Sequence, residues 1–147
     1  MPLVPDDFTV PRVLDVPPFH LEPLGAQHNE ADHAAWTSSI PHIRATPGFA
    51  GSWPPVDGMS LDANLADLER HAADFEARKG FTYSVLDTET RDVIGCLYIY
   101  PKRGGESGTK VSSWVRASHA ELDKTLWTVV SEWLADWPLE GVDYEAR

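Results

Sequence analysis

The sequence predicts a single α/β domain in which helices flank a mainly antiparallel sheet. Three observations predict this class. A chain of 147 residues, 42% of them hydrophobic, suits one core. Strand-like segments at 81–86, 93–100 and 111–116 follow one another closely, which favours antiparallel pairing. A helix-like segment then separates them from a last strand at 141–145, which gives one parallel β-α-β crossover and hence a mixed sheet.

Proline is frequent at the start of the chain. Because proline fixes φ and lacks an N–H donor, residues 1–18 are expected to form an extended arm, and residues 19–147 the single domain. The N-terminus has no basic region followed by an apolar stretch, so we expect no signal peptide. The prolines of the arm are Pro2, Pro5, Pro11, Pro17 and Pro18.

The domain is expected to begin with a strand over residues 19–24, where apolar and polar side chains alternate. A helix over residues 30–38 follows, with Asn29 as its cap. Residues 40–59 are rich in proline and glycine and are expected to form a long loop. A loop of that length inside a compact domain is often functional.

The clearest helix is expected over residues 60–79, with Ser60 as its N-cap and Gly80 just past its end. Apolar residues recur along it at spacings of four, three, four and three, which marks one face of a helix. These residues are Leu61, Leu65, Leu68, Ala72 and Phe75.

The strand at 93–100 is apolar on both faces, so we expect it at the centre of the sheet. Its Cys96 is the only cysteine, which excludes a disulfide within the chain, and it is expected to be a small buried hydrophobe. The last helix is expected to start at Ser118, where Glu121 would complete a capping box. Pro138 prevents that helix from continuing.

Charge and residue spacing exclude several classes of function. The 12 basic and 23 acidic residues give a net charge of −11, which disfavours nucleic acid as a partner. No apolar run is long enough to cross a membrane, so we expect a cytoplasmic protein. The six histidines lack the spacing of a zinc protease, and no phosphate-binding Walker loop is present, so no metal site is expected.

The order of elements resembles the GNAT superfamily of N-acetyltransferases. Residues 92–101, Asp-Val-Ile-Gly-Cys-Leu-Tyr-Ile-Tyr-Pro, look like the third strand of that fold, where a glycine early in an apolar run is common. Ser-Trp-Val-Arg at 113–116 looks like the end of its fourth strand. The resemblance spans about residues 19–145 and implies a GNAT-like sheet with helices on its faces.

The resemblance also implies a site for acetyl-CoA. In active members a loop patterned Gln/Arg-x-x-Gly-x-Gly/Ala follows the fourth strand and holds the pyrophosphate with backbone amides. Carried onto this chain, the cofactor contacts would come from Trp114, Val115, Arg116 and Ser118. Residues 117–124 contain no glycine, however, and include Glu121 and Asp123, which would repel phosphate.

The long loop after the first helix corresponds to the part of the fold that lines the acceptor pocket. The residues expected to form an aromatic and cationic pocket there are Trp36, His42, Arg44, Phe49, Trp53 and Tyr98. No catalytic residue is firmly indicated. His119 and Tyr144 are the candidates for moving a proton.

Two functions stay open, and with them whether the chain is an enzyme. One is acetyl-CoA-dependent N-acetylation of a small amine. The other is a non-catalytic GNAT-fold domain that has lost acetyl-CoA binding and binds a small-molecule ligand or a protein. Family members continue beyond the fifth strand, whereas the printed sequence ends at Arg147. The last strand is therefore expected to have an open edge, covered by the N-terminal arm or by a second subunit in a homodimer.

Overall fold

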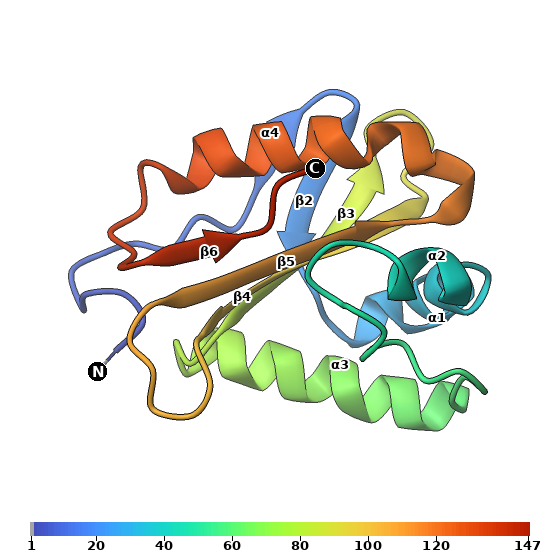
Figure 1. Ribbon diagram of the computed structural model, residues 1–147, viewed down its shortest axis with the longest axis horizontal. Coiled ribbons are helices and arrows are strands. Elements are labelled where there is room, and N and C mark those ends of the chain that lie inside the picture. Colours follow the sequence, from blue (N-terminus) through green and yellow to red (C-terminus); the bar gives the residue numbers. More distant parts are fainter. Residues whose placement is uncertain (1) are drawn as a thin grey trace.

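The computed structural model describes residues 2–147 and forms one six-stranded sheet in the order β1-β2-β3-β4-β5-β6 (Figure 1). The strands are β1 (Leu14–Val16), β2 (Phe19–Pro23), β3 (Phe81–Asp87), β4 (Val93–Pro101), β5 (Thr109–Val115) and β6 (Val142–Tyr144). The helices are α1 (Asn29–Thr37), α2 (Ile40–Arg44), α3 (Leu61–Glu76) and α4 (Asp123–Leu134), with 3₁₀ helices η1 (Ala26–His28) and η2 (Ala117–Leu122).

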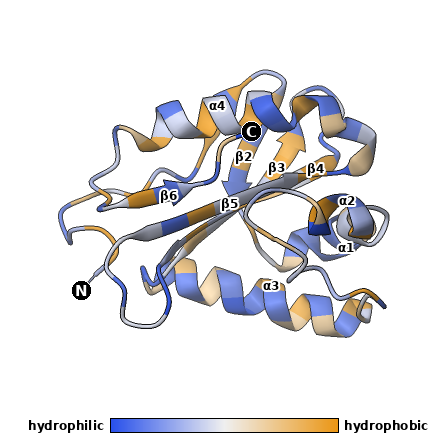
Figure 2. Ribbon diagram, viewed as in Figure 1, coloured by the Kyte–Doolittle hydropathy of each residue, from blue (hydrophilic) through white to orange (hydrophobic). Residues whose placement is uncertain are grey.

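Strands β1 to β5 pair antiparallel in chain order. Strand β5 pairs in parallel with β6, and α4 lies in the connection between these two strands. This arrangement confirms the predicted mixed sheet with one crossover. Helix α4 covers one face of the sheet, while α1, α2 and α3 lie on the other (Figure 1). Figure 2 shows that hydrophobic residues are frequent on the central strands of the sheet, whereas many residues of α3 are hydrophilic.

The two faces of the sheet carry separate apolar clusters. On the α4 side, Leu126, Val130 and Leu134 form the buried stripe of that helix and share one cluster with residues of β3 and β4. On the other side the buried residues come mainly from α1, α2, the 45–60 segment and β4; they are Leu24, Ala35, Trp36, Ile43, Phe49, Leu68, Leu86, Val93, Cys96 and Trp114.

Strand β4 is central, as predicted, because it pairs with β3 and β5 and is buried on both faces. Its side chains do not alternate regularly between the two faces. The pairing register shifts near its start, so that Val85 faces Gly95 and Leu86 faces Val93. This irregularity places Ile94 in the α4-side cluster and Val93 in the other, which reverses the simple alternation.

The arm lies on the domain and adds an edge strand to it. Val4 is buried, Phe8 stacks on Trp137 with ring centroids 5.4 Å apart, and the Tyr83 hydroxyl donates to the Pro11 carbonyl at 2.6 Å. Strand β1 pairs with β2, at the edge opposite β6. The separation into arm and domain and the homodimer through β6 stay predictions.

Several helix boundaries differ from those expected. The segment 40–59 contains α2, which begins with Pro41 in its first turn. Asn29 is the first residue of α1 and not its cap, and its side chain donates to the Leu61 carbonyl of α3. Ser60 does cap α3, since its hydroxyl accepts from the Ala63 amide at 3.1 Å.

The ends of α3 and α4 were also predicted incorrectly. After α3, Arg78 takes the left-handed conformation at φ +59°, and Gly80 serves another purpose: a Cβ there would lie 2.2 Å from the Tyr100 ring. At α4 the expected capping box is absent, because the 3₁₀ helix η2 precedes α4 and the Ser118 hydroxyl bonds to His119 Nδ1 at 2.8 Å.

Gly95 allows β4 and β5 to approach closely, and Gly95→Ala tests this. A Cβ would lie 2.4 Å from the Trp114 carbonyl oxygen, which is backbone of the paired strand. We expect a loss of about 3 kcal/mol in the free energy of unfolding, measured in urea. In the control Gly104→Ala the Cβ meets open space, and only the left-handed φ costs about 1 kcal/mol. Equal losses would show that the close approach at Gly95 is unimportant.

Candidate functional site

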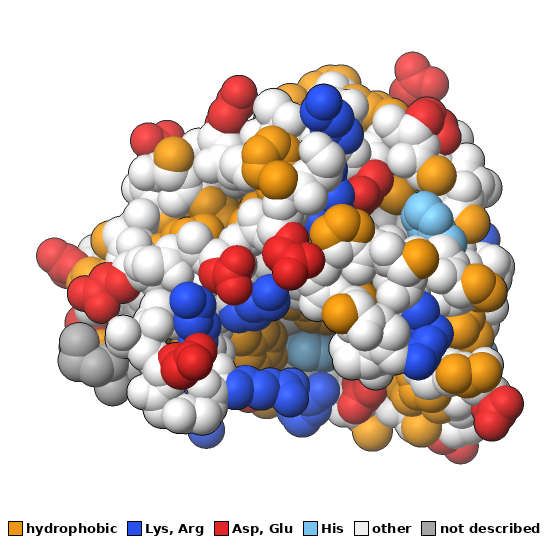
Figure 3. All heavy atoms as spheres, viewed as in Figure 1, with side chains coloured by type: hydrophobic (Ala, Val, Ile, Leu, Met, Phe, Trp, Pro, Cys, Tyr) orange, Lys and Arg blue, Asp and Glu red, His pale blue; other side chains and the backbone are white. Residues whose placement is uncertain are grey.

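A groove of about 920 Å³ opens between α3, the 45–60 segment and strands β4 and β5. Figure 3 shows it as a hollow with a hydrophobic and histidine floor, ringed by charged side chains. Its aromatic lining is Phe49, Trp53, Tyr98 and Tyr100, and its polar lining includes Asp32, Asn64, Asp67, Arg70 and His71. The β4–β5 loop and the strand ends add Lys102, Arg103, Glu106, Lys110, Ser112 and Asp143.

The aromatic wall is a connected stack. The Trp53 ring lies 5.4 Å from Trp36, 6.2 Å from Trp114 and 6.4 Å from Tyr98, centroid to centroid. Trp114 Nε1 donates to the Tyr98 hydroxyl at 3.1 Å. Three of the six residues predicted for the pocket, Phe49, Trp53 and Tyr98, therefore line the groove, and Trp36 lies buried behind Trp53.

The other two predicted pocket residues do not line the groove. Arg44 donates to the Pro54 carbonyl at 2.5 Å and accepts from the Gly51 amide through its own carbonyl, so it holds the 45–60 segment in shape. His42 is half-buried in α2, and its Nε2 atom has no hydrogen-bond partner among the described residues.

A buried carboxylate lies at the α1 end of the groove. Asp32 is only 4% exposed and accepts a hydrogen bond from Asn64 Nδ2 at 3.2 Å. Asn64 is oriented by Trp36, whose Nε1 donates to its Oδ1 at 3.0 Å. Burial raises the pKa of Asp32 to about 6, and the bond from Asn64 opposes that rise. The carboxylate is therefore mostly ionised at pH 7, at an energetic cost.

A neutral histidine occupies the middle of the groove. Tyr100 donates to Asp74 Oδ2 at 2.8 Å, and His71 Nδ1 lies 2.8 Å from the Tyr100 hydroxyl and 3.0 Å from Thr82 Oγ1. Burial, assisted by the nearby Arg70 charge, lowers the pKa of His71 to about 4. The imidazole is therefore neutral at pH 7 and only a weak base.

The sequence contained a signal for this polar lining that the apolar pattern obscured. Asn64, Asp67, His71 and Asp74 recur at spacings of three, four and three, so they form a second stripe on α3 beside the apolar one. Three of them line the groove, and Asp74 orients Tyr100.

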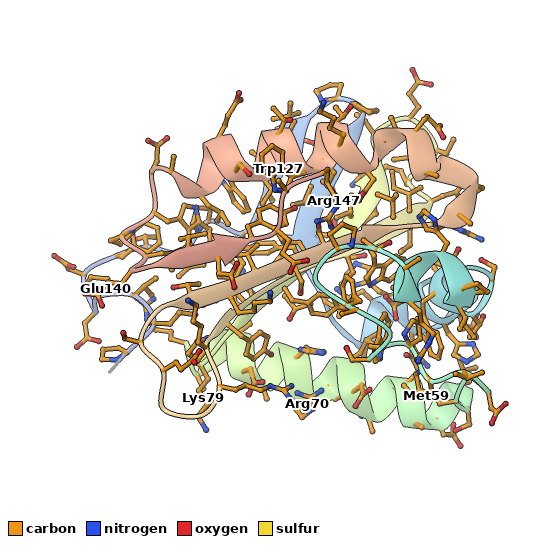
Figure 4. The ribbon with its side chains drawn as sticks, viewed as in Figure 1. Met59, Arg70, Lys79, Trp127, Glu140 and Arg147 are labelled. Carbon is orange, nitrogen blue, oxygen red and sulfur yellow. The ribbon has the colours of Figure 1, made fainter. Side chains whose placement is uncertain are left out.

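The resemblance to GNAT enzymes implies that acetyl-CoA would lie on the α4 side of the sheet, where β5 and β6 separate. Strands β5 and β6 pair only from Thr109 to Val111, so the rest of β5 has backbone groups open on that side. The guanidinium of Arg147 occupies them: it donates to the Ser113 carbonyl at 2.7 Å and to Asp123 Oδ2 at 2.7 Å. Figure 4 shows Arg147 in the space between α4 and β5.

Hydrogen bonds within the protein also use the amides of the expected phosphate loop. The Arg116 amide donates to the Ile94 carbonyl at 2.8 Å, the Ala117 amide to Ser39 Oγ at 2.9 Å, and the His119 amide to the Arg116 carbonyl at 2.8 Å. These amides are therefore not free to bind phosphate, and Asp123, the first residue of α4, adds a negative charge that repels it. In the observed conformation the site does not fit a pyrophosphate.

The residues predicted to contact acetyl-CoA do not converge. Trp114 and Val115 are fully buried, whereas Ser118 is exposed. The Arg116 guanidinium lies against the Val93 carbonyl and Ser38 Oγ, each at 3.4 Å. Of the two proton-transfer candidates, His119 bonds only to Ser118 among the described side chains. Tyr144 bonds to Ser113 Oγ at 2.5 Å, and burial raises its pKa to about 12.

Comparison with known proteins identifies the fold. No protein-family model and no curated protein matches the chain. Solved structures do match over most of its length. A Bordetella pertussis protein provisionally assigned to the GNAT acetyltransferases is 14% identical with a TM-score of 0.62, covering 91% of this chain and 78% of its own. The chain has the GNAT fold.

Two further GNAT-fold structures are enzymes by name. The ribosomal-protein-S5-alanine acetyltransferase of Vibrio fischeri is 11% identical with a TM-score of 0.60, covering 83% of this chain and 66% of its own. The microcin C7 self-immunity acetyltransferase MccE, solved with acetyl-CoA and AMP, is 10% identical with a TM-score of 0.64. The match covers 84% of this chain and 64% of MccE. The chain thus spans about two thirds of these enzymes' length.

None of the helices within residues 2–147 is long and apolar enough to span a membrane. No group of three or more metal-ligating side chains comes together among these residues.

Asp32→Asn tests the cost of the buried carboxylate. Because the folded pKa of about 6 exceeds the unfolded value of 3.8, the stability that Asp32 contributes is full below pH 3.8 and is lost as pH rises through 6. The difference in pKa corresponds to about 3 kcal/mol at pH 7. We expect the stability of Asp32→Asn relative to wild type to increase by that amount between pH 4 and 7 in urea unfolding. A difference independent of pH would contradict the shift.

Arg147→Met tests the contacts beside α4. The change leaves Asp123 without its partner and the Ser113 carbonyl without a donor, and we expect a loss of about 3 kcal/mol in unfolding free energy. The exposed pair Arg12–Glu76, also at 2.8 Å, supplies the control: Arg12→Met should cost less than about 1 kcal/mol. Similar losses in both variants would show that Arg147 is not held as described.

Proposed function

We propose that this chain is a GNAT-fold protein that binds a small molecule in the groove between α3 and the β4–β5 strands and has lost acetyl-CoA binding. The observation that carries the proposal is the position of Arg147. Its side chain is only 4% exposed and donates hydrogen bonds to the β5 backbone and to Asp123. These contacts lie where acetyl-CoA would be expected to bind in this fold. The groove on the opposite side of β5 stays open.

The groove has the character of a binding site. Ligand pockets are concave and mostly apolar, with a few polar groups that fix orientation. Here a stacked aromatic wall faces His71 and Asp32, and both of these groups have pKa values displaced by burial. Displaced pKa values in a cleft are typical of functional sites because a purely structural role does not require their cost.

N-acetylation of a small amine with acetyl-CoA is the second candidate function. It is favoured by the GNAT fold and by the MccE structure that contains acetyl-CoA. It requires Arg147 to leave its present position and the amides of residues 116–119 to become free, and for that reason we rank it second.

Isothermal titration with acetyl-CoA separates the two functions. For the wild-type protein we expect no saturable heat, corresponding to a Kd weaker than about 1 mM. We expect Arg147→Ala to remain unable to bind, because the loop amides stay bonded within the protein. Micromolar binding by wild type would overturn the first function in favour of the second. Binding that appears only in Arg147→Ala would show that this side chain alone closes the site.

Protein-observed fragment screening tests the groove itself. A fragment library is added to labelled protein, and the indole N–H signals are followed. Hits in the groove should shift the Trp114 and Trp53 indoles and leave Trp127 unaffected, since Trp127 lies on α4. Trp53→Ala should weaken those hits at least tenfold, about 1.4 kcal/mol. Hits that shift Trp127 alone would place binding on the other face and contradict the proposal.

A further inference from the structure

The charges of the groove are segregated along its length. At the α1 end the lining charges are the buried Asp32, beside Asn64 and the aromatic wall, and Asp67, which lies one turn further along α3. The opposite end carries Lys102 and Arg103 from the β4–β5 loop and Lys110 from β5. The groove therefore has a negative inner end and a predominantly positive outer end.

The positive end is unusual for this chain. Only 12 of its residues are Lys or Arg against 23 acidic ones, yet four of the twelve line this one groove. Lys110 is 3.6 Å from Asp143, and Arg70 is 3.6 Å from Asp67, so their charges are partly compensated. Within residues 2–147, Lys102 and Arg103 have no carboxylate within ion-pair distance, although Glu106 also lines the mouth. Figure 3 shows the resulting basic rim of the hollow.

The inner end suits a cation. Asp32 can offer a carboxylate oxygen beyond the one that Asn64 engages, and the faces of Trp53 and Tyr98 attract positive charge through their ring quadrupoles. A charge buried without a partner is costly, and a bound ammonium would supply that partner.

The inner half of the groove sets the shortest length of a ligand that reaches both ends. Asn64 marks the inner end, and His71, which contacts Tyr100 two residues before Lys102, lies seven residues further along α3. At 1.5 Å per residue this is about 10 Å. The rings between the ends favour a flat apolar body. We infer that the groove binds a dipolar ligand, with an ammonium group at Asp32, an apolar or aromatic body against Trp53 and Tyr98, and a carboxylate or phosphate at Lys102 and Arg103. This inference rests on the proposed binding function and specifies its ligand.

Four matched probes test the inference. The dipolar probe is 3-[4-(aminomethyl)phenyl]propanoate. Its methyl ester keeps only the ammonium, 3-(4-methylphenyl)propanoate keeps only the carboxylate, and the methyl ester of the latter has neither charge. Binding is measured from the indole N–H shifts of Trp53 and Trp114. We expect the dipolar probe to bind at least tenfold more tightly than each of the other three.

Variants assign each charge to its end of the groove. Asp32→Asn should reduce binding of the dipolar probe to that of the carboxylate-only probe, and Lys102→Met should reduce it toward that of the ammonium-only ester. The matched controls are Glu140→Gln and Lys79→Met, exposed positions outside the groove lining, which should change nothing (Figure 4). The wild-type comparison of the four probes does not depend on any variant folding.

The outcomes separate the ligand class from the binding function. Equal binding of all four probes in the groove, or preference for the uncharged one, overturns the dipolar ligand and leaves the proposed function intact. If none of the four probes binds but library fragments still shift the Trp53 and Trp114 indoles, the dipolar ligand is likewise overturned and the proposed function stays intact. If neither probes nor fragments shift those indoles, the proposed function fails together with the inference.

Discussion

The position of β4 between β3 and β5 is the constraint on which the rest of the structure depends. It is paired along both edges and buried on both faces, so its apolar side chains from Val93 to Ile99 contribute either to the core under α4 or to the opposite cluster. Gly95 permits the close approach of β5, and the register shift beside it assigns Cys96 and Tyr98 to the groove side. The hydroxyl of Tyr98 then holds the Trp114 indole, against which Trp53 stacks. The aromatic wall therefore follows from the strand order.

The two faces of β5 differ in whether they leave room for a ligand. On one face Arg147 bonds to the strand backbone and to Asp123, and hydrogen bonds within the protein use the loop amides around Ala117. On the other face the groove keeps buried polar groups whose burial is unfavourable for folding. Near neutral pH, folding would be served better by an apolar side chain at Asp32, since its raised pKa means that the ionised carboxylate reduces stability. The lowered pKa of His71 reduces stability only as pH falls below about 6.5. Their presence in one groove is the physical argument for binding there.

A fold by itself does not specify an activity, because activity resides in side chains placed on the fold. The GNAT-fold enzymes that this chain matches include one solved with acetyl-CoA, yet at 10–14% identity they establish the arrangement of strands and helices alone. The site chemistry has to come from this chain's own residues. Those residues supply an open groove with one acidic and one basic end, and a cofactor face that is closed by hydrogen bonds in the observed conformation.

By itself, the sequence determined the mixed sheet, its central strand, the apolar stripe of α3 and the absence of a glycine loop, because periodicity and backbone requirements are local properties of a chain. It also indicated six pocket residues, Phe49 and Trp53 among them. Only the tertiary structure decided which of the six reach the groove: Arg44 instead holds the 45–60 segment in shape. It also decided that His71 meets Tyr100, and that Arg147 meets Ser113 and Asp123. These contacts join residues 24 to 34 positions apart, and only the packing of separate elements brings such residues together.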